Sequence, residues 1–401
     1  MFPDNDRFES MFTLENEKNG VIEEKTFRIL VLGDWSGDSE KVEFKNRPII
    51  EIDRDNFDSA LNRCKPNLQL NLSETADEIT SLDFTELDDF HPDNIFRQVP
   101  LFTELRSLRR RLSDPATFNS AAHEVRGWIS DRQIEPTDEN SELPQSVQSD
   151  ELLDQILSGK SEAVRLQKAD SSELSSLLKD LVRPFLIGFD ENEQKSLISL
   201  VDNATGELMR KIIHHQKFQN LEAAWRSLYF LIRNAETDSS LKIYFLNISK
   251  EELIAKLKDN NNLTETEVFR KIVVEANSLF DDDTFSVFVG NYEFDSELDD
   301  VASLIRLSKI GASINCPFIS KMSPKLLDFD SFVDASDSSG WTISEDSRQG
   351  KLWATLRSLP ESEFLGMTLN RFLLRLPFGS ESDQIDSFAF EEFGDKPLHN
   401  N

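Results

Sequence analysis

Apolar residues in the first 130 positions follow two successive patterns. Short strand-like runs, bounded by turn residues, occupy 27–32, 47–53, 68–72 and 82–87. The pattern then becomes helical, because Leu101, Leu105, Leu108 and Leu112 recur at intervals of 4, 3 and 4 and form one apolar stripe. Pro100 is suited to the first turn of that helix, where its missing N–H costs no intrahelical hydrogen bond. A second helical stretch at 118–129 completes this part of the chain.

The stretch 131–149 differs from both of its neighbours. It reads DRQIEPTDENSELPQSVQS, with two prolines, many polar residues and few apolar ones. This composition is typical of a linker. We therefore predict three parts: residues 1–130, a polar linker at 131–149, and residues 150–401.

Helical periodicity resumes after the predicted linker. Residues 152–157 and 174–181 are predicted to be helical, and 193–234 forms a long helical tract. Within this tract the 4, 3, 4 spacing returns, in a second apolar stripe formed by Leu221, Trp225, Leu228 and Ile232. We predict that the two halves of the chain pack through these two stripes, the alternative being that each stripe fills the core of its own half.

Strands and helices then alternate. A strand is predicted at 241–248, and Ser249 followed by Glu251 and Glu252 is typical of a helix start. Further strands are predicted at 284–289 and 316–320, with a helix at 296–315 between them. The predicted fold class is mixed α+β and α/β: a small β-rich and helical domain, then a helical segment, then an α/β domain with a mixed sheet.

Composition narrows the classes of function. The chain has 401 residues, 38% hydrophobic and 29% charged, as expected of a globular protein with a substantial core. Its 74 acidic residues against 44 basic ones give a net charge of −30, which opposes binding to nucleic acid and to anionic lipid. The densest basic cluster is Arg106 with 109–111, for which a solvated or salt-bridged helix face is the favoured interpretation.

Targeting and redox signals agree with a cytoplasmic protein. The first residues, MFPDNDRFESMF, are acidic and lack the apolar core of a secretory signal, and no apolar run approaches the ~20 residues that span a bilayer. Cys64 and Cys316 lie far apart in the sequence, so they form neither a disulfide framework nor a recognisable metal motif. We expect a cytoplasmic protein without membrane insertion.

The stretch FRILVLGDWSG at 27–37 is the best candidate for a phosphate-binding loop. Such a loop needs clustered glycines before a helix, so that several backbone N–H groups converge on the anion. Here only Gly33 and Gly37 are present, Asp34 and Asp38 would repel a phosphate, and a strand-like run follows instead of a helix. We interpret the stretch as a structural, hairpin-like connection.

No other motif supports catalysis or metal binding. His214 and His215 are adjacent, so on a helix their side chains point about 100° apart and do not chelate one ion, whereas zinc helices use i, i+4 spacing. The acidic run 281–283 lacks the glycine and the distal glutamate of a calcium loop. No Ser/His/Asp or Cys/His arrangement stands out. We predict no catalytic, cofactor or metal residues, and a binding or structural protein rather than an enzyme.

Several long phrases resemble one particular family. FRILVLGDWSG, RPIIEIDRDNFDSALNRCKPNLQLNL and LDFTELDDFHPDNIFRQVPLFTELRSLRRRL resemble, over about residues 25–130, the small subunit of the contractile sheath of bacterial type VI secretion systems. From about 150 to 393, LLDQIL, IIHHQKFQNLEAAWRSLYFLI, LKIYFLNISKEEL, VFVGNYEF, GASINCPFIS and EFLGMTLNRFLLRLPFG resemble the N-terminal half of the large subunit. The chain thus resembles a fusion of the two subunits.

The resemblance implies a structural role. In the family the two subunits form a heterodimer that polymerises around an inner tube, exchanging strands between protomers, and contraction drives the tube outward for effector delivery. The implied partners are other sheath subunits, the inner-tube protein, baseplate components and the ATPase that disassembles the sheath. No cofactor is implied. The predicted linker would tether two partners that are usually separate chains.

Two departures from the family pattern leave an alternative open. The large subunit normally continues well beyond its RFLLRLP phrase, so we expect that its C-terminal part is absent here, and Asn370 stands where the family has proline. The alternative to a sheath protomer is a truncated sheath-like paralogue that caps, seeds or recruits. An acidic hydrolase on an α/β scaffold is a third and weaker interpretation.

Overall fold

The computed structural model describes residues 25–72, 79–130, 193–280, 283–327, 329, 341–343, 346–369 and 371–393. Side chains of 127–130 are not described. The predicted linker 131–149, the predicted helices at 152–157 and 174–181, and Asn370 lie outside these residues. Below, "first segment" means residues 25–130 and "second segment" means residues 193–393.

The strands fall in both segments. They are β1 (Phe27–Gly33), β2 (Ile50–Ile52), β3 (Asn67–Asn71), β4 (Ile79–Asp83), β5 (Leu241–Asn247), β6 (Val287–Phe294), β7 (Phe318–Met322) and β8 (Leu365–Thr368). The first-segment helices are α1 (Phe57–Cys64), α2 (Pro92–Gln98), α3 (Pro100–Ser113) and α4 (Phe118–Ser130). The second-segment helices are α7 (Glu193–Ile213), α8 (Gln216–Asn234), α9 (Lys250–Lys258), α10 (Glu267–Phe269), α11 (Ala276–Leu279), α12 (Leu298–Ile314) and α13 (Arg348–Arg357).

One six-stranded sheet is built from both segments. Its order is β2-β5-β1-β6-β7-β8, so first-segment β1 lies between second-segment β5 and β6. β1 runs parallel to β5 from Phe27↔Leu241 to Gly33↔Asn247, and parallel to β6 from Ile29↔Val287 to Leu32↔Gly290. Among the described strands of this sheet, only β2 is antiparallel to its neighbour, while β3 and β4 form a separate antiparallel pair. The predicted mixed α+β fold class is confirmed.

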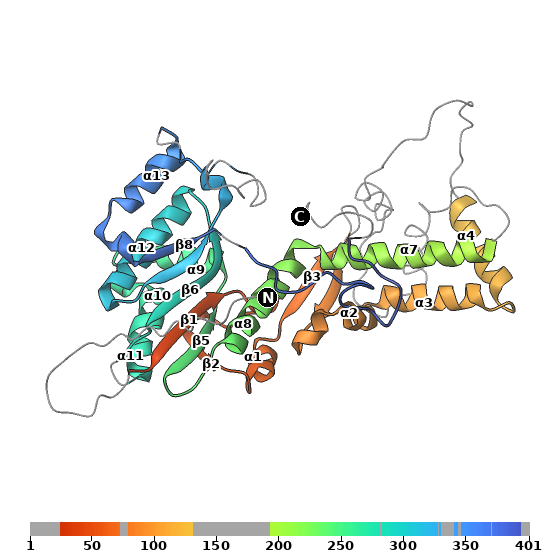
Figure 1. The fold of residues 1–401 in the computed structure, drawn as a ribbon, viewed down its shortest axis with the longest axis horizontal. Helices are drawn as coiled ribbons and strands as arrows, with labels where there is room; N and C mark the ends of the chain where they lie inside the picture. The colour runs from red at the N-terminus through yellow and green to blue at the C-terminus, as the bar shows by residue number, and fades with distance from the viewer. Residues whose placement is uncertain are drawn as a thin grey trace, which may run out of the picture.

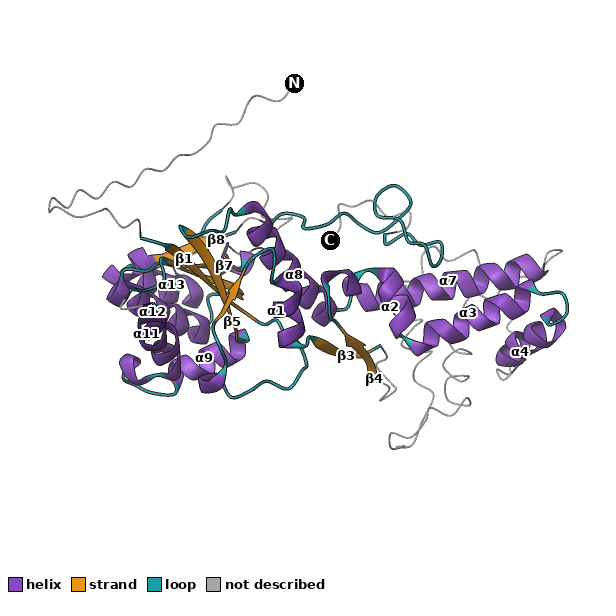
Figure 2. Ribbon diagram, turned by 90° about the horizontal axis from the view of Figure 1, so that it is seen from below, coloured by secondary structure: helices purple, strands orange, loops and turns teal. Residues whose placement is uncertain are grey.

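Alternating side chains of the sheet supply two buried cores, one on each face. Leu30 and Leu32 point into a core with α9, α12 and their neighbours, whereas Val31 points into a core with α1 and α8. Figure 1 shows these helices on opposite sides of the sheet. Beyond α8 the molecule extends into an arm in which α3 and α7 run side by side, with α4 at its tip (Figure 2). The molecule is therefore elongated, with the sheet at one end and the helical arm at the other.

The hairpin interpretation of the stretch 27–37 is wrong. β1 and β2 do not pair with each other, because β5 lies between them and pairs with both. The apolar run of β1 is buried on both faces toward its end, which is typical of a central strand in a parallel sheet. The turn after it is structural nonetheless: Gly37 has φ +59°, and a Cβ there would lie 2.6 Å from the Asn67 carbonyl oxygen.

The other local predictions agree with the structure, apart from small displacements of element boundaries. Pro100 occupies the first turn of α3, and the Ser249 hydroxyl accepts a hydrogen bond from the Glu252 N–H at the start of α9. The strand predicted at 82–87 is displaced: β4 ends at Asp83, because Glu86 and Asp89 form a capping box that opens a 3₁₀ turn. The tract 193–234 is two helices, with the His215 imidazole capping the N-terminus of α8.

The predicted boundaries 1–130, 131–149 and 150–401 give a direct test. We expect that a chain cut at a protease site engineered into 131–149 stays together, because β1 is hydrogen-bonded on both sides to second-segment strands. Size-exclusion chromatography after cleavage should show both fragments in one peak, as for the uncut chain. Elution as two stable monomers would contradict a shared fold.

Candidate assembly site: the joint between the two segments

The apolar centre of the joint is a pair of tryptophans, one from each segment. Trp35 and Trp225 are both fully buried, with ring centroids 6.4 Å apart in an edge-to-face arrangement. The Trp225 indole N–H donates to the Trp35 carbonyl oxygen at 3.0 Å. Phe57 of α1 and Phe245 of β5 pack against Trp225 at 5.7 and 6.1 Å. The stripe on α8 therefore contacts first-segment residues as well as its own segment.

The stripe on α3 lies in the helical arm. Leu105, Leu108 and Leu112 are fully buried and Leu101 is partly buried, in the same continuous core as the α8 stripe. α3 packs against α7 there, and polar contacts border this packing: Arg109 pairs with Asp202 at 2.5 Å, and the Gln194 amide donates to the Leu112 carbonyl oxygen at 2.9 Å. Both predicted stripes, Leu101, Leu105, Leu108, Leu112 and Leu221, Trp225, Leu228, Ile232, thus contribute to one core. Their role in assembly between chains stays a prediction.

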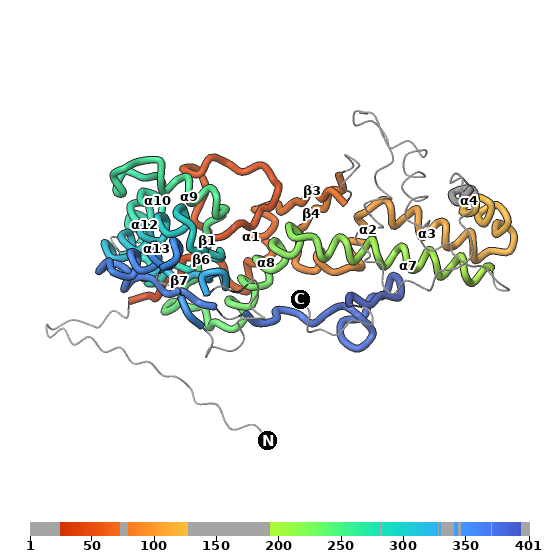
Figure 3. Tube along the Cα trace, turned by 90° about the horizontal axis from the view of Figure 1, so that it is seen from above, coloured from red at the N-terminus to blue at the C-terminus, as the bar shows by residue number. Residues whose placement is uncertain are grey.

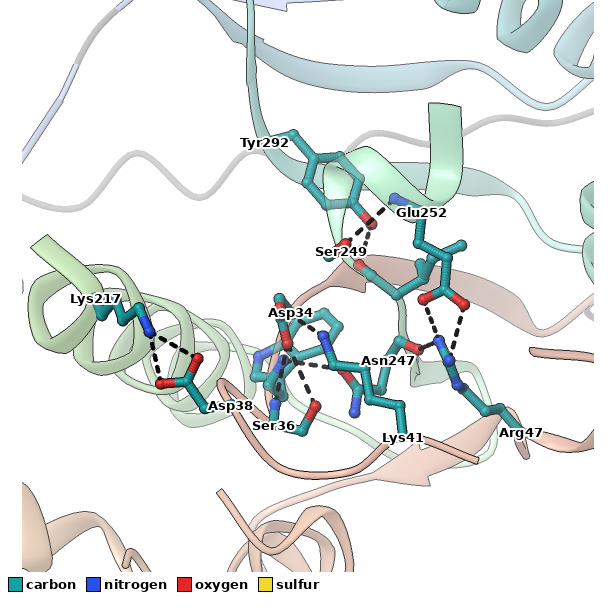
Figure 4. A network of polar contacts seen from close by, with 12 residues as sticks. Asp34, Ser36, Asp38, Lys41, Arg47, Lys217, Asn247, Ser249, Glu252 and Tyr292 are labelled. Atoms are coloured by element: carbon teal, nitrogen blue, oxygen red, sulfur yellow. Dashed lines mark hydrogen bonds and ion pairs between the residues drawn. The ribbon is translucent and has the colours of Figure 1, made fainter. Parts of the chain in front are cut away.

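Polar contacts join the segments at the carboxyl end of β1 and β5 (Figure 4). The Arg47 guanidinium, buried to 6% exposure, donates to both Glu252 carboxylate oxygens at 2.6 and 2.8 Å and to the Asn247 carbonyl oxygen at 2.9 Å. This bidentate geometry is the strongest form of an Arg–carboxylate pair. Asn247 also accepts, through its side-chain oxygen, from the Trp35 N–H at 3.0 Å. Arg47 therefore fixes β5 and α9 against the first segment.

A second ion pair of the joint lies on α8. The Lys217 ammonium contacts both Asp38 carboxylate oxygens at 2.9 and 3.0 Å. Burial works to raise the pKa of Asp38, but the Gln69 N–H and Lys217 outweigh it and lower that pKa. The carboxylates that oppose phosphate binding in the sequence thus serve as partners of lysines: Asp38 binds Lys217, and Asp34 binds Lys41 at 2.7 Å.

A first-segment arginine also satisfies the end of α8. The Arg54 guanidinium donates to the carbonyl oxygens of Ile232, Arg233 and Ala235 at 3.2, 2.5 and 3.3 Å. The last carbonyls of a helix have no intrahelical partner and carry partial negative charge, so a cation there is stabilising. Because α8 carries the Trp225 stripe, this cap adds a further contact between the two segments.

The C-terminal stretch 371–393 forms a strap that leaves the sheet and runs along α8 and α7 toward α2 (Figure 3). On α2, the Asp93 carboxylate accepts from the N–H groups of Asp386 and Ser387 at 3.1 and 2.8 Å. Phe388 stacks on Phe96 with centroids 5.0 Å apart. The strap therefore binds second-segment chain to first-segment helices, far from the sheet.

A buried ionic cluster anchors the strap to α7 and α8. Arg375 donates to Glu222 and to Glu392, each at 2.8 Å, and Glu392 also accepts from the Phe378 N–H at 2.8 Å. His214 Nε2 lies 3.4 Å from a Glu392 oxygen. Burial works to raise the pKa of Glu392, but these donors and the Arg375 charge lower it to about 2. His214, which the sequence analysis rejected as a metal ligand, thus lies beside a buried salt-bridged cluster.

A cleft of about 570 Å³ opens at the carboxyl ends of the parallel strands, the usual ligand position in α/β sheets. Its lysines are each paired with a carboxylate: Lys217 with Asp38, Lys250 with Asp300 at 2.6 Å, and Lys321 with Glu293. The positive charge of each lysine is therefore already balanced by a carboxylate, which leaves little attraction for a phosphate placed in the cleft. The cleft therefore lacks the electrostatics of a nucleotide site.

The described residues offer little for metal or thiol chemistry. Within them, no three His, Cys, Asp or Glu side chains are grouped to hold a metal ion. Burial raises the pKa of both the Cys64 and the Cys316 thiol to about 12, which keeps them protonated and unreactive. None of the described helices combines the length and the apolarity needed to cross a bilayer.

Residues 195–401 match the VipB family, described as EvpB/VC_A0108, tail sheath N-terminal domain. Residues 5–148 match the family described as type VI secretion system, VipA, VC_A0107 or Hcp2. The chain belongs to the tail sheath family of bacterial type VI secretion, with a small-subunit-like part preceding a large-subunit-like part.

A curated relative supports this family. The type VI secretion system sheath protein TssC1 of Pseudomonas aeruginosa is 38% identical over 200 residues, which cover 49% of this chain and 40% of TssC1. The chain thus spans less than half the length of that relative. The family and the relative are those of structural sheath proteins, which agrees with the prediction of a structural role.

Sequence reasoning missed the polar contacts of the joint. Arg47, Arg54 and Asp93 are ordinary charged residues by pattern, and their partners lie about 180 to 290 residues away along the chain. A signal did exist for Trp35, because tryptophan side chains are highly buried on average, which favours a covering element over the turn that holds this ring. The sequence, however, does not show that α8 covers it.

The Arg47–Glu252 pair gives a stability prediction. We expect Arg47→Met to lower the free energy of unfolding by about 3 kcal/mol, because it leaves a largely buried carboxylate without its partner. Urea unfolding followed by tryptophan fluorescence measures this. The matched control is Lys45→Met, whose partner Glu43 is exposed, so no measurable loss of stability is expected. Arg47→Met combined with Glu252→Met should recover part of the loss; equal losses for Arg47→Met and Lys45→Met would contradict a buried pair.

Glu392 gives a pH prediction. Its pKa is about 2 in the folded chain against an ordinary 4.5, so its ionised form stabilises the fold by on the order of 3 kcal/mol above pH 4.5. That contribution is lost as pH falls from 4.5 toward 2. Glu392→Gln should remove it at pH 7 and flatten the dependence of stability on pH in this acid range, as measured by denaturant unfolding at several pH values. Glu381→Gln, at an exposed position of the strap, is the control; an unchanged acid slope in Glu392→Gln would refute the assignment.

Proposed function

We propose that this chain is a fused sheath protomer, with residues 1–130 in the place of the small subunit, 131–149 as tether and 150–401 as the N-terminal domain of the large subunit. The observation that carries the proposal is β1: a strand of the small-subunit-like part pairs on both sides with strands of the large-subunit-like part. A small-subunit-like part and a large-subunit-like part that complete one sheet are required in equal numbers. A tether sets that proportion at 1:1 and raises the effective concentration to about the millimolar range.

The finer role follows from the family. In this proposal the protomer assembles in the cytoplasm with other sheath subunits around an inner-tube protein, contacts baseplate components, and contracts to drive effector delivery. An ATPase that disassembles sheaths would act on the contracted form. The buried ionic and aromatic joint suits such a role, because a protomer that transmits force must not separate into its two segments.

The net charge favours a second role, in which the chain joins a sheath built by other chains. With a net charge of −30, copies of this chain repel one another, and the repulsion is strongest at low salt, where the Debye length is long. A chain with this field is suited to join sheath subunits of other composition rather than copies of itself. The alternative is therefore a capping, seeding or recruiting module on a sheath built by other chains.

Assembly is the test of both roles. We expect monomers or small oligomers from the purified chain at low salt, and larger particles when salt is raised or a full-length large sheath subunit such as TssC1 is added. Light scattering across a salt series, with negative-stain microscopy, measures this. An unrelated acidic globular protein in place of the sheath subunit is the control.

The outcomes separate the interpretations. Particles only with the added sheath subunit favour the capping or recruiting role, whereas tubes from the chain alone at raised salt favour the protomer. Long tubes from the chain alone at low salt would contradict the charge argument. Failure to associate with any sheath subunit at any salt concentration would overturn the proposed function.

A further inference from the structure

Hydrogen bonds within the strap close part of it into a loop. The Glu392 N–H donates to the Phe378 carbonyl oxygen at 2.9 Å, and the Phe378 N–H donates to the Glu392 carboxylate at 2.8 Å. Inside this closure the Ser380 N–H donates to the Glu391 carboxylate at 3.0 Å. Compact surface loops whose two ends meet are held by their own contacts. The strap can therefore keep its shape without the elements beneath it.

Side chains attach the strap to the rest of the molecule. Among the described residues, no backbone-to-backbone hydrogen bond joins 375–393 to another part of the chain. The attachments include the two N–H groups held by the Asp93 carboxylate and the stacking of Phe388 on Phe96. By contrast, β1 is held by backbone hydrogen bonds to a strand on each side. Opening of the strap therefore leaves every strand pairing of the six-stranded sheet in place.

The buried ionic cluster around Arg375 divides into two ion pairs along the boundary of the strap. Arg375 and Glu392 both belong to the strap, and their ion pair at 2.8 Å is internal to it. Glu222 and Arg226 both belong to α8, where they pair at 2.7 Å across one helical turn. The ion pair that crosses the boundary is Arg375–Glu222, also at 2.8 Å. Opening the strap breaks this crossing pair and separates Glu392 from His214, but it leaves each carboxylate with an arginine.

This division lowers the electrostatic cost of opening. Breaking a buried ion pair is expensive mainly because it leaves one charge without a partner. Here neither Glu222 nor Glu392 is left alone, and both gain access to water as the strap leaves. Opening is opposed instead by the apolar part of the contact, because Phe378, Ile385 and Phe390 are buried in the closed strap.

We propose that the strap is a releasable element of the fold. It leaves α2, α7 and α8 as one unit, while the sheet and the packing of α3 on α7 stay intact, and the Arg375–Glu222 pair is the contact that controls its release. In the closed form the strap covers α2 around Phe96, so only the open form presents that surface to a neighbouring molecule. The chain thus has a second conformation in which the shared sheet is unchanged.

Hydrogen exchange of the full chain in native buffer, resolved to single amides by mass spectrometry, tests the release. The reporter amides are those of Asp386 and Ser387, which lose their Asp93 acceptor when the strap opens, whereas the amides of β1 lose theirs only when the sheet unfolds. After correction for intrinsic rates, we expect the reporter amides to exchange faster than those of β1 by about tenfold or more. Equal rates would show that the strap opens only with global unfolding, and would overturn the proposal.

Two substitutions in the ionic cluster should act in opposite directions. Glu222→Gln weakens the contact between the strap and α8, so the reporter amides should exchange about tenfold faster. Arg226→Met makes Glu222 depend on Arg375 alone, and opening would then leave that carboxylate unpaired. The reporter amides should therefore exchange more slowly in Arg226→Met, by about twofold or more. Glu381→Gln, at an exposed position of the strap, is the control and should leave the rate unchanged.

The signs of these changes distinguish controlled release from a cluster that only adds stability. If the cluster only adds stability, both substitutions loosen the strap, so faster exchange in Arg226→Met contradicts the proposal. An unchanged rate in Glu222→Gln would exclude the Arg375–Glu222 pair as the contact that controls release. Rates are read relative to the β1 amides of the same variant, which removes any change in global stability. None of these results bears on whether the chain joins a sheath, so this test and the assembly test fail independently.

Discussion

The fold depends on the backbone hydrogen bonds of β1. A buried strand must pair its N–H and C=O groups on both sides, since an unpaired buried polar group costs as much as a lost hydrogen bond. For β1 both partners, β5 and β6, come from the second segment. The first segment therefore cannot bury its most apolar strand within itself, and the second segment without β1 would leave a gap in the middle of its sheet.

The remaining contacts of the joint follow from that insertion. Because β1 ends beside β5, Trp35 lies against α8, and Arg47 contacts the first turn of α9. Arg54 then reaches the last carbonyls of α8, and the strap closes over α2 through Asp93. These contacts lie on several elements and on both cores. Together they make the two segments one cooperative unit.

Local sequence patterns, periodicity together with capping residues, located most of the strands and the long helices, but not α1, α13 or β8. The two leucine-rich stripes, Pro100 at the start of α3 and Ser249 at the start of α9 were recognisable because helix geometry and capping are local in sequence. The neighbours of β1 could not be recognised in this way. The alternation of apolar and polar residues determines which face of the sheet a side chain occupies, but not which strand lies alongside. For the same reason the pairs of Arg47 and Arg375 were invisible, since a guanidinium that binds a distant carboxylate has no sequence signature of its own.

The central position of β1 also has a consequence for synthesis of the chain. Phe27 pairs with Leu241 and Ile29 with Val287, so β1 has no partner strand until most of the chain has left the ribosome. At ordinary rates of translation that interval is on the order of ten seconds or more. During it the nascent chain carries an apolar, β-prone run with both edges open, the form most exposed to mispairing with other chains. A chain that joins both segments therefore gains their proximity at the cost of a late-closing sheet, in which β1 stays open to mispairing until β5 and β6 have been synthesised.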